Sequence, residues 1–96
     1  MGKYKLPVEY TKITQAVRRE VREQYIAEQN GLCIFCHAPL VEDPPKNITD
    51  KKINMSLFPS GFLNSPIHLQ HSHITNMTEG AVHAYCNAVL WQYYGR

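Results

Sequence analysis

The stretch that decides the fold is Gln70-His-Ser-His-Ile-Thr-Asn-Met-Thr-Glu-Gly-Ala-Val-His-Ala-Tyr-Cys-Asn87. Its first two histidines, His71 and His73, would project from one face if this segment is a strand. A polar turn follows. The segment His83-Ala-Tyr-Cys86 then places two metal-binding side chains three residues apart, where a turn that tightens into a helix could close both on one ion. Asn87 is expected to open that helix, because asparagine is favoured near helix N-termini.

A second pair of candidate ligands lies upstream in Cys33-Ile-Phe-Cys36. Such a turn directs both sulfurs to one point, as a tetrahedral zinc ion requires, although redox-active pairs share the spacing. With His83 and Cys86 it supplies three thiolates and one imidazole and uses every cysteine of the chain. We therefore predict a structural zinc site with these four ligands. His37 competes for the fourth position, and a pair of buried thiols beside an unrelated histidine is the alternative.

The stretch resembles the HNH (ββα-metal) endonuclease superfamily, most closely the phage recombination endonuclease VII type. Members carry a gapless pattern close to Asp-His-Asp-His-x-Thr-Gly-x-Val-Arg-Gly-Leu-Leu-Cys-x-x-Cys-Asn. The chain matches this pattern at His71, His73, Thr75, Gly80, Cys86 and Asn87. It departs from the pattern at Gln70 and Ser72 (for the two Asp), Asn76 (for Gly), Glu79 (for Arg) and His83 (for the first Cys).

The resemblance implies an α+β fold: a small zinc-stabilised ββα-metal domain with an N-terminal helix and a long central loop. It also implies a metal-dependent DNA endonuclease. By position, His71 would be the general base that deprotonates the attacking water, a role that suits a neutral imidazole. Asn87 and Gln70 would bind a catalytic Mg²⁺ or Mn²⁺. His73 would orient the phosphate or support the fold.

Gln70 is the main departure, because a neutral amide stands where the family has its metal-binding carboxylate. Mg²⁺ is usually held by one or two carboxylates together with substrate phosphates. Gln70 could coordinate through its oxygen while a DNA phosphate supplies the negative charge, or the active site could have decayed or been altered. The alternative function is therefore a catalytically silent zinc module of the same fold that binds DNA or a protein. A zinc-stabilised structural protein with unrelated work is the third hypothesis.

The 96 residues are expected to form one domain, in which a zinc staple would help because a chain this short buries only about two-thirds of its unfolded surface. The predicted parts are an N-terminal arm and helix (1–31), a zinc knuckle (32–41), a loop insertion (42–66) and the ββα-metal motif (67–96). Apolar residues at intervals of four predict a helix over 12–30; they are Ile13, Val17, Val21 and Tyr25.

Proline and glycine exclude a long helix from the central segment 42–66, yet its apolar residues suggest that it packs onto the domain. Alternation of apolar and polar residues predicts a strand over 67–71, in which His68 is expected to face away from the site or to cap its edge. A short returning strand is expected at 81–82. The final helix, 87–94, is rich in aromatic residues, which we expect to belong to the core.

The net charge of +2 favours no class of partner, but its distribution is uneven. Nine of the ten basic residues lie within 1–52. The candidate DNA-phosphate contacts are Arg18, Arg19, Arg22, Lys51 and Lys52, with a solvated helix face as the alternative for the arginines. The sequence has no signal peptide or transmembrane run, so we expect a cytoplasmic protein with no membrane partner, compatible with a phage-encoded protein that acts in a bacterial host. A homodimer stays open.

Overall fold

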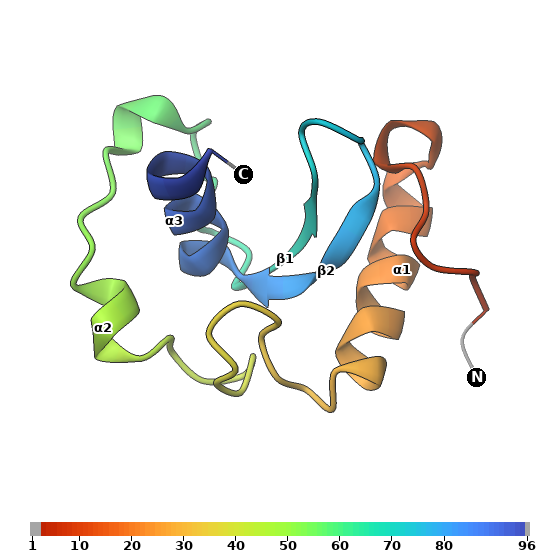
Figure 1. The fold of residues 1–96 in the computed structure, drawn as a ribbon, viewed down its shortest axis with the longest axis horizontal. Coiled ribbons are helices and arrows are strands. Elements are labelled where there is room, and N and C mark those ends of the chain that lie inside the picture. The colour runs from red at the N-terminus through yellow and green to blue at the C-terminus, as the bar shows by residue number, and fades with distance from the viewer. Residues whose placement is uncertain (1–2, 96) are drawn as a thin grey trace.

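A two-stranded sheet lies between two helices, with an extended arm at the N-terminus (Figure 1). The structure is a computed structural model that describes residues 3–95. Its elements are η1 (Tyr10–Lys12), α1 (Gln15–Glu28), α2 (Lys46–Thr49), η2 (Met55–Leu57), β1 (Ile67–His71), β2 (Thr78–His83) and α3 (Ala84–Tyr94). The predicted α+β class is confirmed. The ends of the predicted domain, residues 1, 2 and 96, lie outside the described residues.

Helix α1 begins three residues later and ends two residues earlier than the predicted range 12–30. The Thr14 hydroxyl caps it by accepting a hydrogen bond from the backbone N–H three residues later. Of the predicted apolar stripe, Val21 and Tyr25 are buried against the rest of the molecule. The Asn30-Gly31 pair adopts left-handed backbone angles, with φ of 57° and 75°, and this stops the helix.

The hairpin of β1 and β2 is antiparallel, with Gln70 opposite Gly80. The register slips between Gln70 and His71, so that His71 lies opposite Thr78. The returning strand is thus six residues long, against the two predicted. Because β1 ends at His71, His73 lies in the following turn and not in a strand with His71, as the spacing had predicted. The two rings still lie together, with their centroids 4.8 Å apart.

The outer edge of β2 is covered by the end of α1 and the knuckle that follows it. The Gln29 side chain accepts a hydrogen bond from the Ala81 N–H (2.8 Å) and donates one to the Ala81 carbonyl (2.9 Å). The Ile34 N–H donates to the same carbonyl (3.1 Å). A side chain at Gly80 would place its Cβ 2.8 Å from the Gln29 Oε1 atom, so this close approach requires glycine.

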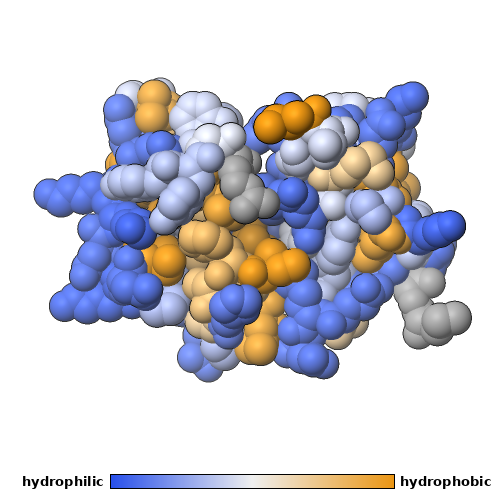
Figure 2. Space-filling model, viewed as in Figure 1, coloured by the Kyte–Doolittle hydropathy of each residue, from blue (hydrophilic) through white to orange (hydrophobic). Residues whose placement is uncertain are grey.

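The buried core joins the sheet, α1, the knuckle and α3 in one cluster, because each of these elements turns one apolar face inward. Its members are Val21, Tyr25, Cys33, Leu40, Ile48, Ala81, Val82, Cys86, Val89 and Leu90. Two of the four predicted zinc ligands therefore belong to the core itself. A band of hydrophobic residues also runs through the lower middle of the face shown in Figure 2, and hydrophilic side chains make up most of its left and right outline.

The central segment 42–66 packs against α3, as its apolar residues predict. It contains α2, whose Ile48 is buried, and η2, whose Met55 and Leu57 are exposed. The Tyr85 hydroxyl donates to the Lys51 carbonyl (2.5 Å), and the Tyr93 hydroxyl donates to the Lys52 carbonyl (2.7 Å). These hydrogen bonds fasten the segment along the helix.

Helix α3 begins at Ala84, so Asn87 lies within its first turns and does not open it as predicted. Cys86, Val89 and Leu90 are buried, whereas the three aromatic residues at 91, 93 and 94 are exposed. The expectation that these aromatic side chains belong to the core is therefore wrong. Within residues 3–95, no helix has both the length and the apolar character needed to cross a membrane.

Candidate functional site

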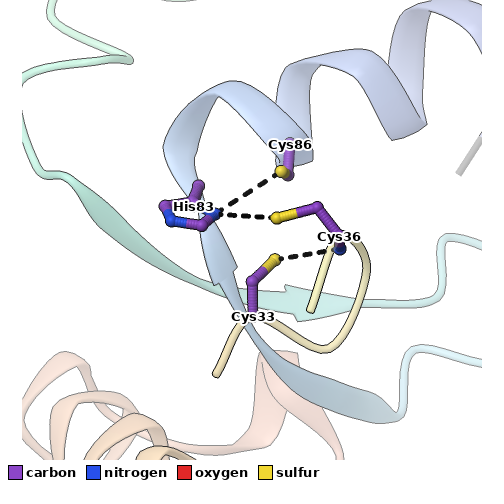
Figure 3. Close-up of side chains that lie close together, drawn as sticks. All are labelled: Cys33, Cys36, His83 and Cys86. Atoms are coloured by element: carbon purple, nitrogen blue, oxygen red, sulfur yellow. Dashed lines mark hydrogen bonds between the residues drawn. The ribbon is translucent and has the colours of Figure 1, made fainter. Parts of the chain in front are cut away.

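Four side chains converge between the knuckle and the start of α3, and they are the predicted ligands Cys33, Cys36, His83 and Cys86 (Figure 3). Their candidate ligand atoms all lie within 4.8 Å of one another. A tetrahedral zinc ion with Zn–S bonds of about 2.3 Å holds its sulfur ligands about 3.8 Å apart. The cluster could therefore hold a metal ion such as zinc. His37 is exposed and lies outside this group.

The knuckle brings its two cysteines together through a tight turn. The Cys33 N–H donates to the Ala38 carbonyl (2.8 Å), and the His37 N–H donates back to the Cys33 carbonyl (2.9 Å). His37 has a φ of 67°, so the reversal needs one residue in the left-handed region. The Cys36 N–H lies 3.5 Å from the Cys33 sulfur, where it stabilises a thiolate. These backbone hydrogen bonds turn both sulfurs toward the same side of the knuckle.

His83 presents the nitrogen that a metal would need. Its Nε2 lies 2.9 Å from the carbonyl oxygens of both Pro39 and Glu42. A carbonyl oxygen can only accept, so Nε2 carries a proton, and Nδ1 is the ring nitrogen that a metal ion could take. Nδ1 faces the sulfurs of Cys36 (3.3 Å) and Cys86 (3.6 Å). Metal-binding histidines are commonly oriented by a second hydrogen bond of this kind.

The pKa values of the three thiols are shifted in different directions. A hydrogen bond from the Cys86 thiol lowers the pKa of Cys33 to about 4, against the opposing effect of burial. The same hydrogen bond, together with burial, raises the pKa of Cys86. Burial also raises the pKa of Cys36. A cation bound among them would displace the remaining protons, so metal affinity should rise with pH.

A second site is a pocket of about 910 Å³ between α1, the hairpin, the central segment and α3. The predicted residues that it brings together are Arg18, Arg19, Arg22, His71, His73 and Asn87. Aromatic side chains complete the lining, chiefly Tyr10, Phe58, Phe62 and Trp91. Among residues 3–95, no aspartate or glutamate lines this pocket. The pocket is therefore suited to an anion.

Gln70, Lys51 and Lys52 do not line the pocket. Gln70 is only 3% exposed, and its amide donates to the His71 carbonyl (3.2 Å). Of the two residues that the motif pairs as metal ligands, Asn87 therefore lines the pocket and Gln70 does not. Lys51 and Lys52 lie beside α3, where their carbonyls accept hydrogen bonds from tyrosine hydroxyls.

His71 is held in a stack of three planar groups. Its ring lies 3.8 Å from the Tyr10 ring and is 8° from parallel with it. The Arg18 guanidinium covers the same Tyr10 ring at 3.9 Å, and its Nε donates to the Tyr10 carbonyl (3.2 Å). Burial, followed by the nearby His73 and Arg18 charges, lowers the pKa of His71. The imidazole is therefore neutral, and able to accept a proton, at neutral pH.

His68 lines the pocket, so the expectation that it faces away from the site is wrong. Its Nδ1 lies 3.1 Å from the Asn87 amide nitrogen, which can only donate. The Phe62 ring meets its imidazole edge-on at 4.8 Å, and burial lowers the pKa of His68. Strict alternation places His68 and His71 on opposite strand faces, yet both line the pocket. The register slip beside Gln70 has no signal in the spacing of these residues.

Comparison of the chain with protein-family models, with curated proteins and with solved structures gives no significant match. The resemblance to the HNH superfamily therefore depends on the motif residues alone.

Tyr10 is expected to set the protonation of His71. Replacing it with alanine would open His71 to water and raise the pKa of His71 toward its ordinary value, because burial is the largest cause of the shift. Tyr10→Phe keeps the ring and should leave this pKa unchanged. NMR titration of the histidine ring protons measures the difference. An unchanged His71 pKa in Tyr10→Ala would show that the stack does not control it.

The arginines of α1 are expected to bind DNA phosphates. Arg19→Ala and Arg22→Ala should each reduce the salt dependence of DNA binding by about 0.9 in the slope of log K against log salt, if each contacts one phosphate. Lys46→Ala is the charge-matched control, since Lys46 is exposed and does not line the pocket. Lys51→Ala and Lys52→Ala test whether bound DNA also contacts the segment that follows α2. Equal slopes for all five variants and the natural protein would remove the pocket as the phosphate site.

Proposed function

We propose that the protein is a DNA endonuclease of the HNH type that hydrolyses phosphodiester bonds, with His71 as general base. In this proposal Cys33, Cys36, His83 and Cys86 hold a structural zinc ion. The single observation that supports it most is the pocket in which His71 and Asn87 lie with three arginines. These are the groups that a phosphodiester hydrolase needs, a base and cations for the phosphate, gathered from parts of the chain up to about 70 residues apart in the sequence.

In the proposed reaction a water oxygen attacks phosphorus while His71 accepts the water proton. The bond between phosphorus and the leaving oxygen breaks, and the leaving oxygen takes a proton from solvent. The arginines stabilise the negative charge that accumulates on the phosphate oxygens. The lowered pKa of His71 keeps its ring neutral, which is the form that can accept a proton.

The pocket residues do not fit a preformed magnesium or manganese site. Among residues 3–95, the side chains that line the pocket offer the Asn87 amide and histidines but no carboxylate. Mg²⁺ usually needs one or two carboxylates. The metal dependence that the motif implies would therefore require phosphate oxygens of the DNA as ligands beside Asn87.

The lack of a carboxylate in the lining, among residues 3–95, favours a second candidate function, a catalytically silent zinc module that binds DNA. Both a nuclease and a silent module would bind DNA phosphates in this pocket, so a binding measurement cannot distinguish the two functions. Cleavage separates them.

The test is cleavage of supercoiled plasmid and of oligonucleotides across a titration of Mg²⁺ and of Mn²⁺. We expect nicking, and its dependence on the ion concentration shows whether DNA phosphates and Asn87 together bind a divalent ion. Asn87→Asp is the informative variant, because it adds a carboxylate of matched size to the pocket wall, where Gln70→Asp would bury one. A natural protein without activity beside an active Asn87→Asp would assign the natural chain to the silent module. Inactivity of both proteins on every DNA form would remove the nuclease proposal.

A further inference from the structure

The pocket has two chemically different walls. On one side α1 contributes Arg18, Arg19 and Arg22. On the other side aromatic rings form a continuous row, in which Phe62 lies 4.8 Å from Phe58 and Phe58 lies 5.5 Å from Trp91. The row runs from the central segment onto α3. A ligand that fills the pocket therefore meets cations on one side and π-faces on the other.

Trp91 is much less buried than the two residues before it in α3. Val89 is fully buried and Leu90 nearly so, whereas Trp91 is 41% exposed. It lies four residues after Asn87, so both side chains lie on the same face of α3, and both line the pocket. Its partner Phe58 is half-buried and meets it edge-on, at 67° between ring planes. This contact uses the edge of one ring and leaves ring surface for a further stacking partner.

Nucleic acid strands carry phosphate and base on opposite sides of each sugar, which matches these two walls. In a duplex the base faces are stacked on each other and only base edges reach a protein. An aromatic wall can stack only with a base that has left the duplex, and such stacking occurs with any base because each has a π-face. The volume of about 910 Å³ is within the range of small-ligand pockets, about 300–1,000 Å³. It is of a size for a nucleotide and its flanking phosphate.

We propose that the pocket binds an unpaired nucleotide of a DNA strand, with the phosphate on the α1 arginines and the base against Trp91 and Phe58. The inference rests on the proposed function in one respect, the choice of DNA as the ligand. It adds that the substrate contains a single-stranded or distorted segment. It also assigns a role to the central segment 42–66, which delivers Phe58 to the pocket.

Trp91 is the only tryptophan of the chain, so its fluorescence reports directly on this wall. The probes are a ten-residue oligothymidylate, the same strand with its central nucleotides replaced by abasic sites, a blunt duplex of equal length, and inorganic phosphate. Binding is measured without added Mg²⁺ or Mn²⁺. We expect the single strand to quench Trp91 and to bind about 5- to 150-fold more tightly than the abasic strand, the value of one stacked base. Phosphate alone and the duplex should leave the emission nearly unchanged.

Variants show whether the wall causes the preference, with fluorescence anisotropy of a labelled strand as the readout. Phe58→Ala and Trp91→Ala should lose the preference for the single strand over the abasic strand. Tyr94→Ala is the matched control, because Tyr94 is an aromatic residue of the same helix, 55% exposed, that does not line the pocket. It should keep the full preference.

Equal affinity for the single, abasic and duplex DNA, or single-strand binding that leaves Trp91 emission unchanged, would overturn the inference. The outcome is separable from that of the nuclease proposal. Stacking without cleavage of any DNA form supports the inference and removes the nuclease. Cleavage of duplex DNA without a single-strand preference supports the nuclease and removes the inference.

Discussion

Replacing Cys33 with serine is expected to leave the protein unfolded under conditions in which the natural chain is folded. Cys33 is fully buried in the core and belongs to the four-residue cluster. Structural zinc contributes an apparent free energy of about 10–16 kcal/mol in small zinc-binding peptides. That is comparable with the whole stability of a small domain, about 5–15 kcal/mol. Loss of a zinc ion from this cluster would therefore remove most of what holds the knuckle to the start of α3.

Elemental analysis and thermal unfolding followed by circular dichroism test this prediction. The natural protein should contain one zinc per chain. In chelator it should already be unfolded at low temperature, so that no thermal unfolding transition is seen. His37→Ala is the control, since this histidine adjoins Cys36 but is exposed and outside the cluster; it should keep the zinc and the melting temperature. A natural protein that holds no zinc and melts at the same temperature in chelator would contradict the prediction.

Replacing His71 with alanine is expected to reduce DNA cleavage by about 10²- to 10⁴-fold, the usual cost of losing a general base. The fold and the zinc content should be unchanged, because His71 lies at the end of β1 and is not one of the four clustered ligands. His73→Ala should cost less, since His73 lies in the turn beyond the strand and is exposed. Initial rates on supercoiled plasmid measure both effects. Equal losses in the two variants would remove the assignment of His71 as the base.

The pH profile gives a second measure of the same role. A base acts in its neutral form, so the rate should fall as pH decreases through the pKa of His71. Burial, His73 and Arg18 lower that pKa, so the fall should come below the ordinary histidine value of about 6.5. A rate that falls instead on the alkaline side would point to a protonated group as the essential one.

The cysteine spacing and the apolar periods of the sequence were enough to predict that Cys33, Cys36, His83 and Cys86 come together and that α1 is a helix. Both depend on local geometry: a Cys-x-x-Cys turn has few conformations, and a period near 3.6 fits only a helix. The partners that set the chemistry of His71 could not be predicted in this way. Tyr10 and Arg18 reach it from the arm and α1, through tertiary packing that leaves no period in the sequence. His68 was missed because a slip in strand register is not encoded by alternation.

Helix α3 carries Cys86, Asn87 and Trp91 on one rigid element, which fixes the angular relation between the cluster of four candidate ligands and the pocket. Each residue of an α-helix advances the side-chain direction by about 100°. A single residue inserted after Cys86 would therefore turn Asn87 and Trp91 together away from the pocket while the cluster kept its four ligands. Substitutions along this helix can change the chemistry of either site and leave their relative orientation unchanged. An insertion or deletion directly after Cys86 would change that orientation. The number of residues between the two sites along α3 therefore fixes how they are oriented relative to each other.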